Sequence, residues 1–98
     1  MQNIILKRND IGGDSVKPRA HPYGDKNICG ENVERLRKEK GMKQITLVQR
    51  MQLLGVDINP SSLSKLEGQM RIATDRELWA IAKILGVTID SLVSIPEE

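Results

Sequence analysis

The stretch GVDINPSSLSKLEGQ, residues 55–69, contains the helix start that decides how this chain folds. Asn59 is a residue type that caps helix N-termini, and Pro60 follows at the first helical position, where its missing N–H costs nothing. Ile58 and Leu63 have the spacing of a hydrophobic staple, in which the residue before the cap packs against the helix. A helix is therefore predicted to begin at Pro60.

This helix has two chemically different faces at a turn of about 100° per residue. Leu63, Leu66 and Glu67 lie on one face, which is mainly apolar. The opposite face consists of Ser61, Lys65 and Gly68. A carboxylate on an apolar face is costly unless it is paired, so the environment of Glu67 is a central question for the fold.

Two helices are predicted before this stretch. The first begins at about Asn27 and ends at Gly41, a glycine in the C′ position that commonly follows a helix. The second covers residues 44–54, and its predicted N-cap, Lys43, is a poor capping residue, which makes this the least certain boundary. The apolar residues expected to point inward are Ile28, Val33, Leu36, Leu47, Val48, Met51 and Leu54.

Two further helices are predicted after it. Thr74 and Glu77 form a capping box that opens the fourth helix, which ends at Gly86, and Thr88 caps a short fifth helix. Their expected interior residues are Leu78, Ile81, Ala82 and Leu85, with either Ile89 or Leu92. Five short helices with short connections predict an all-α fold, a compact five-helix bundle over residues 27–95.

The segments outside this domain show no lasting apolar period. Residues 1–26 are rich in Gly, Pro, Asp and Asn and are predicted to form a flexible N-terminal leader, and residues 96–98 a solvated C-terminal end. Two alternatives concern the leader: residues 4–6 form a short strand or dock on the domain, or Lys17 and Arg19 act as a flexible arm on DNA.

Composition excludes several classes of protein. The chain has 98 residues, enough for one small domain, and its one cysteine, Cys29, cannot form an intrachain disulfide. No His or second Cys lies near Cys29, so no metal site is expected. His21 has no catalytic neighbours and no glycine-rich phosphate loop is present, so we expect neither an enzyme nor a cofactor. No run approaches the roughly 20 apolar residues of a membrane span, which favours a cytoplasmic protein.

Charge is distributed unevenly along the chain. Residues 35–50 carry six basic residues against Glu39, a balance of +5, whereas residues 57–98 carry four basic and seven acidic residues, a balance of −3. Such polarity orients a protein against a polyanion. The alternative interpretation is a solvated helix face that is rich in lysine.

Residues 28–93 resemble the Cro and phage-repressor type of helix-turn-helix domain, the XRE family. The resemblance rests on Leu36-Arg37 before Gly41, Gln44 opening the second helix, Leu47-Val48, Leu63-Ser64 before Leu66-Glu67, and Ile81-Ala82 before Leu85-Gly86-Val87. It implies a lambda-repressor-like fold in which the second and third helices form the motif. The third helix would enter the major groove of double-stranded DNA.

The resemblance also implies roles for individual residues. Gln44 matches the glutamine that binds a phosphate, and Lys43 and Arg71 flank the motif as expected phosphate contacts. Arg37 occupies the family position that pairs with Glu67, which predicts a structural ion pair across the first and third helices. The expected base contacts, from a serine- and lysine-bearing helix start, are Asn59, Ser61, Ser62 and Lys65.

The sequence departs from the family pattern at three places. The segment 55–67 is longer than the common spacing, whereas helix-turn-helix turns usually have about three or four residues. Gly68 comes one residue early, so Gln69 stands where the family glycine is expected, and Lys43 replaces the usual capping Ser or Thr. The longer turn leaves the approach angle of the third helix open.

These features predict a sequence-specific DNA-binding transcriptional regulator, acting as a repressor. It would bind a near-palindromic operator as a homodimer, through the fifth helix and the region of Trp79, although Trp79 could instead cover the core. The chain ends soon after the fifth helix, so no small-molecule effector domain is expected. The alternative function is a protein-interaction module on the same fold, such as an antitoxin or anti-repressor partner.

Overall fold

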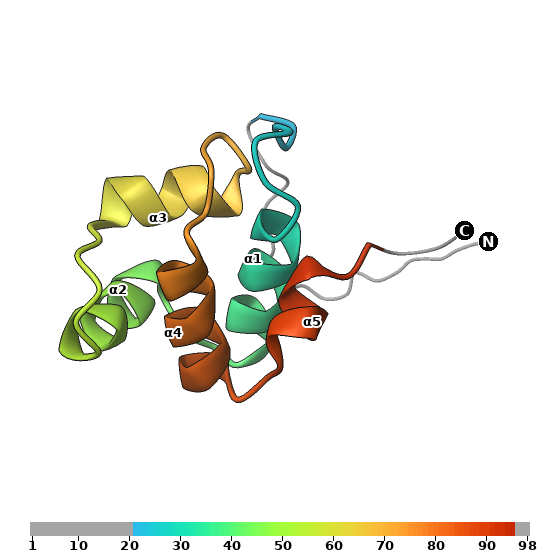
Figure 1. Cartoon of the computed structure of the whole chain (residues 1–98). Helices are drawn as coiled ribbons and strands as arrows, with labels where there is room; N and C mark the ends of the chain where they lie inside the picture. The colour runs from blue at the N-terminus through green and yellow to red at the C-terminus, as the bar shows by residue number, and fades with distance from the viewer. Residues whose placement is uncertain (1–20, 96–98) are drawn as a thin grey trace.

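The computed structural model describes residues 21–95, so the expectations for residues 4–6, Lys17 and Arg19 lie outside the described residues. The described part contains five helices and no strand (Figure 1). They are α1 (Gly30–Glu39), α2 (Gln44–Leu53), α3 (Pro60–Glu67), α4 (Asp75–Leu85) and α5 (Ile89–Val93). The predicted all-α, five-helix fold is confirmed.

The helices are arranged around one apolar core. In Figure 1, α2 and α3 lie at the left, α5 lies at the right, and α1 and α4 lie between them. Every helix buries at least one large apolar side chain completely, and these include Val33, Leu47, Leu63, Ile81 and Leu92. Each such burial stabilises the fold by about 1.5–3 kcal/mol, so all five helices depend on the same interior.

Most of the residues predicted to point inward are buried or half-buried, and two positions, Ile28 and Gly68, differ from the expectation. Ile28 lies just before α1 and is 54% exposed, because the helix begins only at Gly30. Of the two candidates in α5, Leu92 is buried and Ile89 is 44% exposed. Gly68 was expected on the outer face of α3 but is buried, because the chain before α1 packs against it.

The long connection between α2 and α3 is part of the core. Val56 and Ile58 are both buried, and the side-chain amide of Gln52 donates a hydrogen bond to the carbonyl oxygen of Ile58 over 2.8 Å. At the end of the connection, Asn59 Oδ1 accepts a hydrogen bond of 2.8 Å from the backbone N–H of Ser62. The extra residues therefore place α3 firmly and form no loose loop.

Helices α1, α2 and α3 end with the same hydrogen-bond pattern, the Schellman motif, which needs one residue in the left-handed conformation. Gly41 and Gly55 supply it after α1 and α2, with φ of 66° and 88°. After α3 the residue is Gln69, with φ of 60°, the one non-glycine residue of the described chain with positive φ. Gln69 stands where the family pattern has a glycine and adopts the same left-handed backbone conformation. For a non-glycine residue this conformation costs about 1–2 kcal/mol.

The chain before α1 forms a strap, residues 23–29, that crosses the C-terminal end of α3. Gly24 N–H donates to Gly68 O over 2.8 Å, and Lys26 N–H donates to Gln69 O over 2.9 Å. The hydrogen bonds of the domain therefore extend into the predicted leader, residues 1–26. Sequence patterns missed this because the contacts are made by backbone groups, which leave no apolar period.

Candidate nucleic-acid interface

Of the four predicted base-contact residues, Asn59, Ser61 and Ser62 lie at the cap or in the first half of α3, and Lys65 lies in its last turn. Asn59, Ser61 and Lys65 are exposed and Ser62 is half-buried. The Asn59 side chain caps the helix, whereas the side chains of Ser61 and Lys65 form no hydrogen bond or ion pair with any described residue. Ser64, which the sequence interpretation did not assign, is also exposed on this helix. The outer face of α3 thus offers hydroxyl and ammonium groups that residues 21–95 leave unbonded.

The inner face of α3 contains a buried charge cluster. Arg37 donates from Nε to Glu67 Oε2 over 2.7 Å and from Nη2 to Glu67 Oε1 over 3.0 Å. Its third nitrogen, Nη1, donates to Met42 O over 2.7 Å. The Glu67 side chain is only 1% exposed, and that of Arg37 is 8% exposed. The structure therefore brings together the two residues expected to pair, and joins α1 to α3 at this point.

Gln44 completes this cluster from the first turn of α2. Its Nε2 donates to Glu67 Oε1 over 2.8 Å, so the carboxylate connects α1, α2 and α3. One N–H of the amide and the carbonyl oxygen remain for another partner. Lys43, the residue before α2, has extended backbone and makes no side-chain capping bond. The backbone N–H groups of the first turn of α2 are consequently available to an anion such as phosphate.

Basic residues gather beside the start of α2. Lys40, Lys43 and Arg50 line one surface hollow together with the hydroxyl-bearing Thr46. None of these three cations pairs with a carboxylate among residues 21–95. Lys40 and Arg50 were noted as part of a basic segment but not as site residues, and this hollow gives that charge a definite place.

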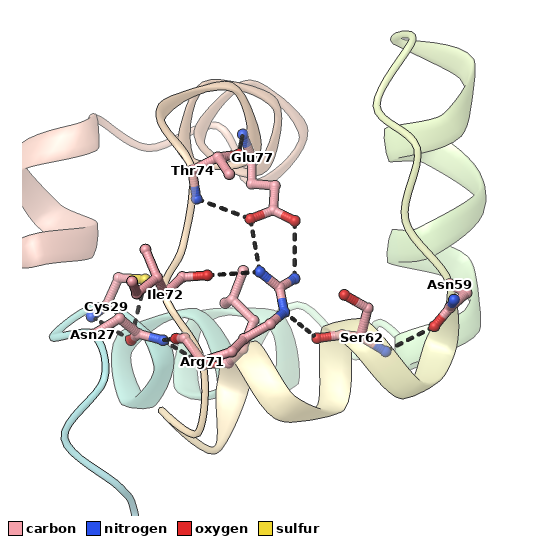
Figure 2. Close-up of polar contacts among 9 residues, drawn as sticks. Asn27, Cys29, Asn59, Ser62, Arg71, Ile72, Thr74 and Glu77 are labelled. Carbon is pink, nitrogen blue, oxygen red and sulfur yellow. Dashed lines mark hydrogen bonds and ion pairs between the residues drawn. The ribbon is translucent and has the colours of Figure 1, made fainter.

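Arg71 occupies a different environment from the exposed position that a phosphate contact requires. Its guanidinium donates to Ser62 O, Ile72 O and both carboxylate oxygens of Glu77, so four of its five N–H groups are bonded within the protein (Figure 2). This bonding gives Arg71 a structural role that the sequence interpretation, which assigned it only as a phosphate contact, did not include. Glu77, which supplies the partner carboxylate, was predicted only as half of a capping box.

The electrostatics of Glu77 reflect this contact. Burial by itself would raise the pKa of the carboxyl group, but the hydrogen bonds from Arg71 and from the Thr74 backbone outweigh it and lower the pKa below its ordinary value. Glu77 is therefore held ionised beside Arg71.

Asn27 is a second residue whose role the sequence did not indicate. Its Nδ2 donates to Arg71 O over 2.8 Å, and its Oδ1 accepts from the backbone N–H of Cys29 (Figure 2). Nδ2 also donates to Leu66 O over 3.1 Å, and Oδ1 also accepts from the backbone N–H of Gly30. Asn27 thus caps the start of α1 and binds the end of α3. An asparagine shortly before a predicted helix is the signal that would have suggested the cap, but nothing local indicates its distant partners.

Cys29 is a buried core residue, as expected for a small apolar side chain. Its Sγ donates to Asn27 Oδ1 over 3.4 Å, and burial raises the pKa of the thiol. Within residues 21–95 no three His, Cys, Asp or Glu side chains lie close enough together to hold a metal ion. None of the helices described for those residues is both long enough and apolar enough to cross a membrane.

Trp79 is 46% exposed and lines a surface hollow with Ile89, Asp75 and Arg76. An apolar surface flanked by one acidic and one basic residue has the chemistry of a contact surface for another protein.

The arrangement of α2, its buried turn and an α3 with a free polar outer face defines a helix-turn-helix protein. A family model described as "Helix-turn-helix" matches residues 33–92. The chain belongs to this family, of the XRE type, whose members are DNA-binding transcriptional regulators. No curated protein and no solved structure gives a match.

Proposed function

We propose that the protein is a sequence-specific transcriptional repressor that inserts α3 into the major groove of its operator DNA. The observation that carries this proposal is the unequal use of polar groups on α3. The inner Glu67 is bonded to Arg37 and Gln44, whereas Ser61 and Lys65 point outward without a partner among the described residues. Serine hydroxyls donate to or accept from base edges, and lysine favours guanine O6 and N7.

The start of α2 supplies the contacts to the DNA backbone in this proposal. Lys43 is exposed, and Gln44 keeps one amide N–H after bonding Glu67. The unbonded N–H groups of the first α2 turn add a helix-terminal anion site. These groups fix the position of α3 in the groove, whereas Asn59, Ser61, Ser62 and Lys65 select the sequence.

The operator is expected to be near-palindromic, because such repressors bind as dimers with half-sites about one helical turn apart. The surface that supports dimer formation is the exposed pair Trp79 and Ile89, with Asp75 and Arg76 beside it. A two-fold axis through this surface would let Asp75 of one protomer face Arg76 of the other. Analytical ultracentrifugation of Trp79→Ala, with and without DNA, tests it: an unchanged oligomer size would contradict the dimer surface.

The function is tested by selecting bound sequences from a random pool of double-stranded DNA. Enrichment of one half-site motif, repeated about one turn apart, is the expected outcome. Titrations of the selected site against salt then separate the two kinds of contact. Lys65→Ala should lower discrimination between bases by about 1–3 kcal/mol. Lys43→Ala should weaken all sequences alike and reduce the salt slope by about 0.9.

The matched control is Lys83→Ala, which removes the same charge from an exposed lysine on the last turn of α4. It should change neither the selected motif nor the salt slope. A pool with no enriched sequence would reject the repressor function. It would favour the alternative, a protein-interaction module such as an antitoxin or anti-repressor partner, with the Trp79 surface as its contact site.

A further inference from the structure

Arg71 lies in the connection between α3 and α4, and its guanidinium joins the two helices that this connection separates. It bonds to α3, to the connection between α3 and α4, and to the first turn of α4 (Figure 2). Nε donates to Ser62 O over 3.0 Å, and Nη1 donates to Ile72 O over 2.8 Å. Nη1 and Nη2 donate to the two carboxylate oxygens of Glu77, over 3.0 and 2.8 Å.

Both ends of this connection are held in place. The Glu77 carboxylate also accepts from the backbone N–H of Thr74 over 2.9 Å, and the Thr74 hydroxyl accepts from the Glu77 N–H over 3.1 Å, so the carboxylate is locked to the first turn of α4. At the other end, the carbonyl of Arg71 accepts from Asn27 Nδ2 over 2.8 Å. A forked cation between two fixed points has little freedom to change position.

The point where Arg71 meets α3 lies among the proposed base contacts. Ser62 N–H donates to Asn59 Oδ1, and Ser62 O accepts from Arg71 Nε, so two side chains position the same residue. Ser62 is next to Ser61 and one helical turn from Lys65. A small movement of Ser62 would therefore displace the outward side chains relative to α4.

We infer that Arg71 and Glu77 are positioning residues, which set the placement of the first half of α3 and so control the base selectivity of DNA binding without contacting DNA. This inference rests on the proposed function. It differs from the sequence expectation in a testable way, because a phosphate contact acts on all sequences alike, whereas a positioning residue acts on the preferred sequence.

Glu77→Gln is the most informative variant, because a positioning role and a purely electrostatic effect predict opposite changes in the affinity for the selected DNA site. The change removes a negative charge, which by electrostatics alone would leave DNA binding unchanged or strengthen it. The amide offers one acceptor where the carboxylate offers two, so the Arg71 fork is weakened. We expect affinity for the selected site to fall about tenfold, with non-specific affinity unchanged or slightly higher.

Glu31→Gln is the matched control. Glu31 lies in the first turn of α1, is exposed, and its carboxylate has no bonded partner among residues 21–95, so the same charge is removed without the loss of a side-chain contact. Its selected motif and affinity ratio should equal those of the wild type. Equal behaviour of Glu77→Gln and Glu31→Gln would overturn the inference.

A measurement without DNA tests the positioning itself. The backbone amide resonances of residues 61–67 should shift in Glu77→Gln, most strongly near Ser62, and remain in place in Glu31→Gln. Unmoved α3 resonances in Glu77→Gln would overturn the inference even if DNA affinity had changed.

The double variant Arg71→Gln/Glu77→Gln covers the possibility that a single Arg71 variant fails to fold by leaving the Glu77 carboxylate unpaired. Selectivity should fall as in Glu77→Gln, with an unchanged salt slope. A slope reduced by about 0.9 would restore Arg71 as a phosphate contact and reject the inference. A wild-type protein without any sequence preference would instead reject the proposed function, and the selectivity part of this inference with it. The amide resonances would then decide separately whether Arg71 and Glu77 hold α3.

Discussion

The outer and inner faces of α3 differ in how their polar groups are bonded. On the outer face, the side chains of Ser61 and Lys65 have no bonded partner among residues 21–95. On the inner face and at the C-terminal end, nearly every polar group is bonded: Glu67 to Arg37 and Gln44, and Gly68 and Gln69 to the strap. The difference shows that this short helix is anchored through its inner face and its C-terminal end, whereas the described residues leave the polar side chains of its outer face unbonded.

The largest expected effect is the loss of the buried carboxylate at the anchored end. Glu67→Ala leaves Arg37 buried without its partner, which should lower the free energy of unfolding by about 3–5 kcal/mol. The control, Glu39→Ala, removes an exposed carboxylate that faces Arg35 over 3.4 Å and should cost less than about 1 kcal/mol. Urea denaturation compares them, and a Glu67→Ala stability within error of Glu39→Ala would contradict the anchoring.

The next effect concerns the close approach of α1 to the end of α3. A Cβ added at Gly30 would lie 2.3 Å from Leu66 O and 2.6 Å from Glu67 O, both backbone atoms that cannot rotate away. We expect Gly30→Ala to destabilise the protein by about 1–3 kcal/mol, because the two helices must separate. Thermal unfolding followed by circular dichroism measures it. A melting temperature equal to that of the wild type would show that this junction is looser than the structure indicates.

A smaller effect is expected at Gln69, where strain and hydrogen bonds oppose each other. Its left-handed backbone is costly, but its side chain donates to Gly24 O over 2.9 Å and accepts from Glu31 N–H over 3.0 Å. Gln69→Ala loses both bonds and keeps the strain, whereas Gln69→Gly loses the bonds and relieves it. The glycine variant should therefore be the more stable of the two by about 1 kcal/mol. Equal stability of the two variants would argue against the left-handed backbone.

Acid should weaken the contact between Arg71 and Glu77, through which Arg71 holds the first half of α3. Because the pKa of Glu77 is lowered in the folded protein, its stabilisation is present above the ordinary glutamate pKa of 4.5 and is lost as the pH falls below that value, through the lowered pKa. Unfolding curves between neutral pH and pH of about 3 should show a loss in the wild type that is smaller in Glu77→Gln. Parallel curves for the two proteins would contradict the assignment.

The smallest effect on stability is expected on the outer face of α3. Lys65→Ala removes an exposed side chain without a partner among the described residues, so the free energy of unfolding should stay within about 0.5 kcal/mol of the wild type. A larger loss would mean that Lys65 supports the fold, and the contrast between the outer and inner faces of α3 would disappear.

The helices could be predicted from the sequence because their signals are local. Asn59 with Pro60 predicted the start of α3, and Thr74 with Glu77 predicted the capping box of α4, which the structure contains. These signals involve residues within one turn of each other, and the periodic apolar faces between them added the core. The arrangement of the helices in space then followed from the family resemblance.

The site was predictable only where a family pattern supplied the long-range partner. Arg37 and Glu67 are 30 residues apart, and the resemblance paired them. Nothing comparable pointed to Arg71 and Glu77 as a pair or to Asn27 as a link to α3. Asn27 and Arg71 donate to backbone carbonyl oxygens, and Arg71 also donates to the capping carboxylate of Glu77. Such bonds depend on folded geometry that no local pattern encodes. Arg71 was consequently predicted as a surface cation.

The strap extends the hydrogen-bonded domain beyond the segment that the family model matches. The family match covers residues 33–92, yet the last turn of α3 is bonded to Gly24, Lys26 and Asn27, all of which precede the match. On the far side, Asn32 Nδ2 holds the carbonyl oxygens of Leu92 and Ser94. A fragment trimmed to the matched residues would leave the carbonyl groups at the end of α3 to water, so the segment that the family model matches is shorter than the hydrogen-bonded unit, which includes residues 23–29.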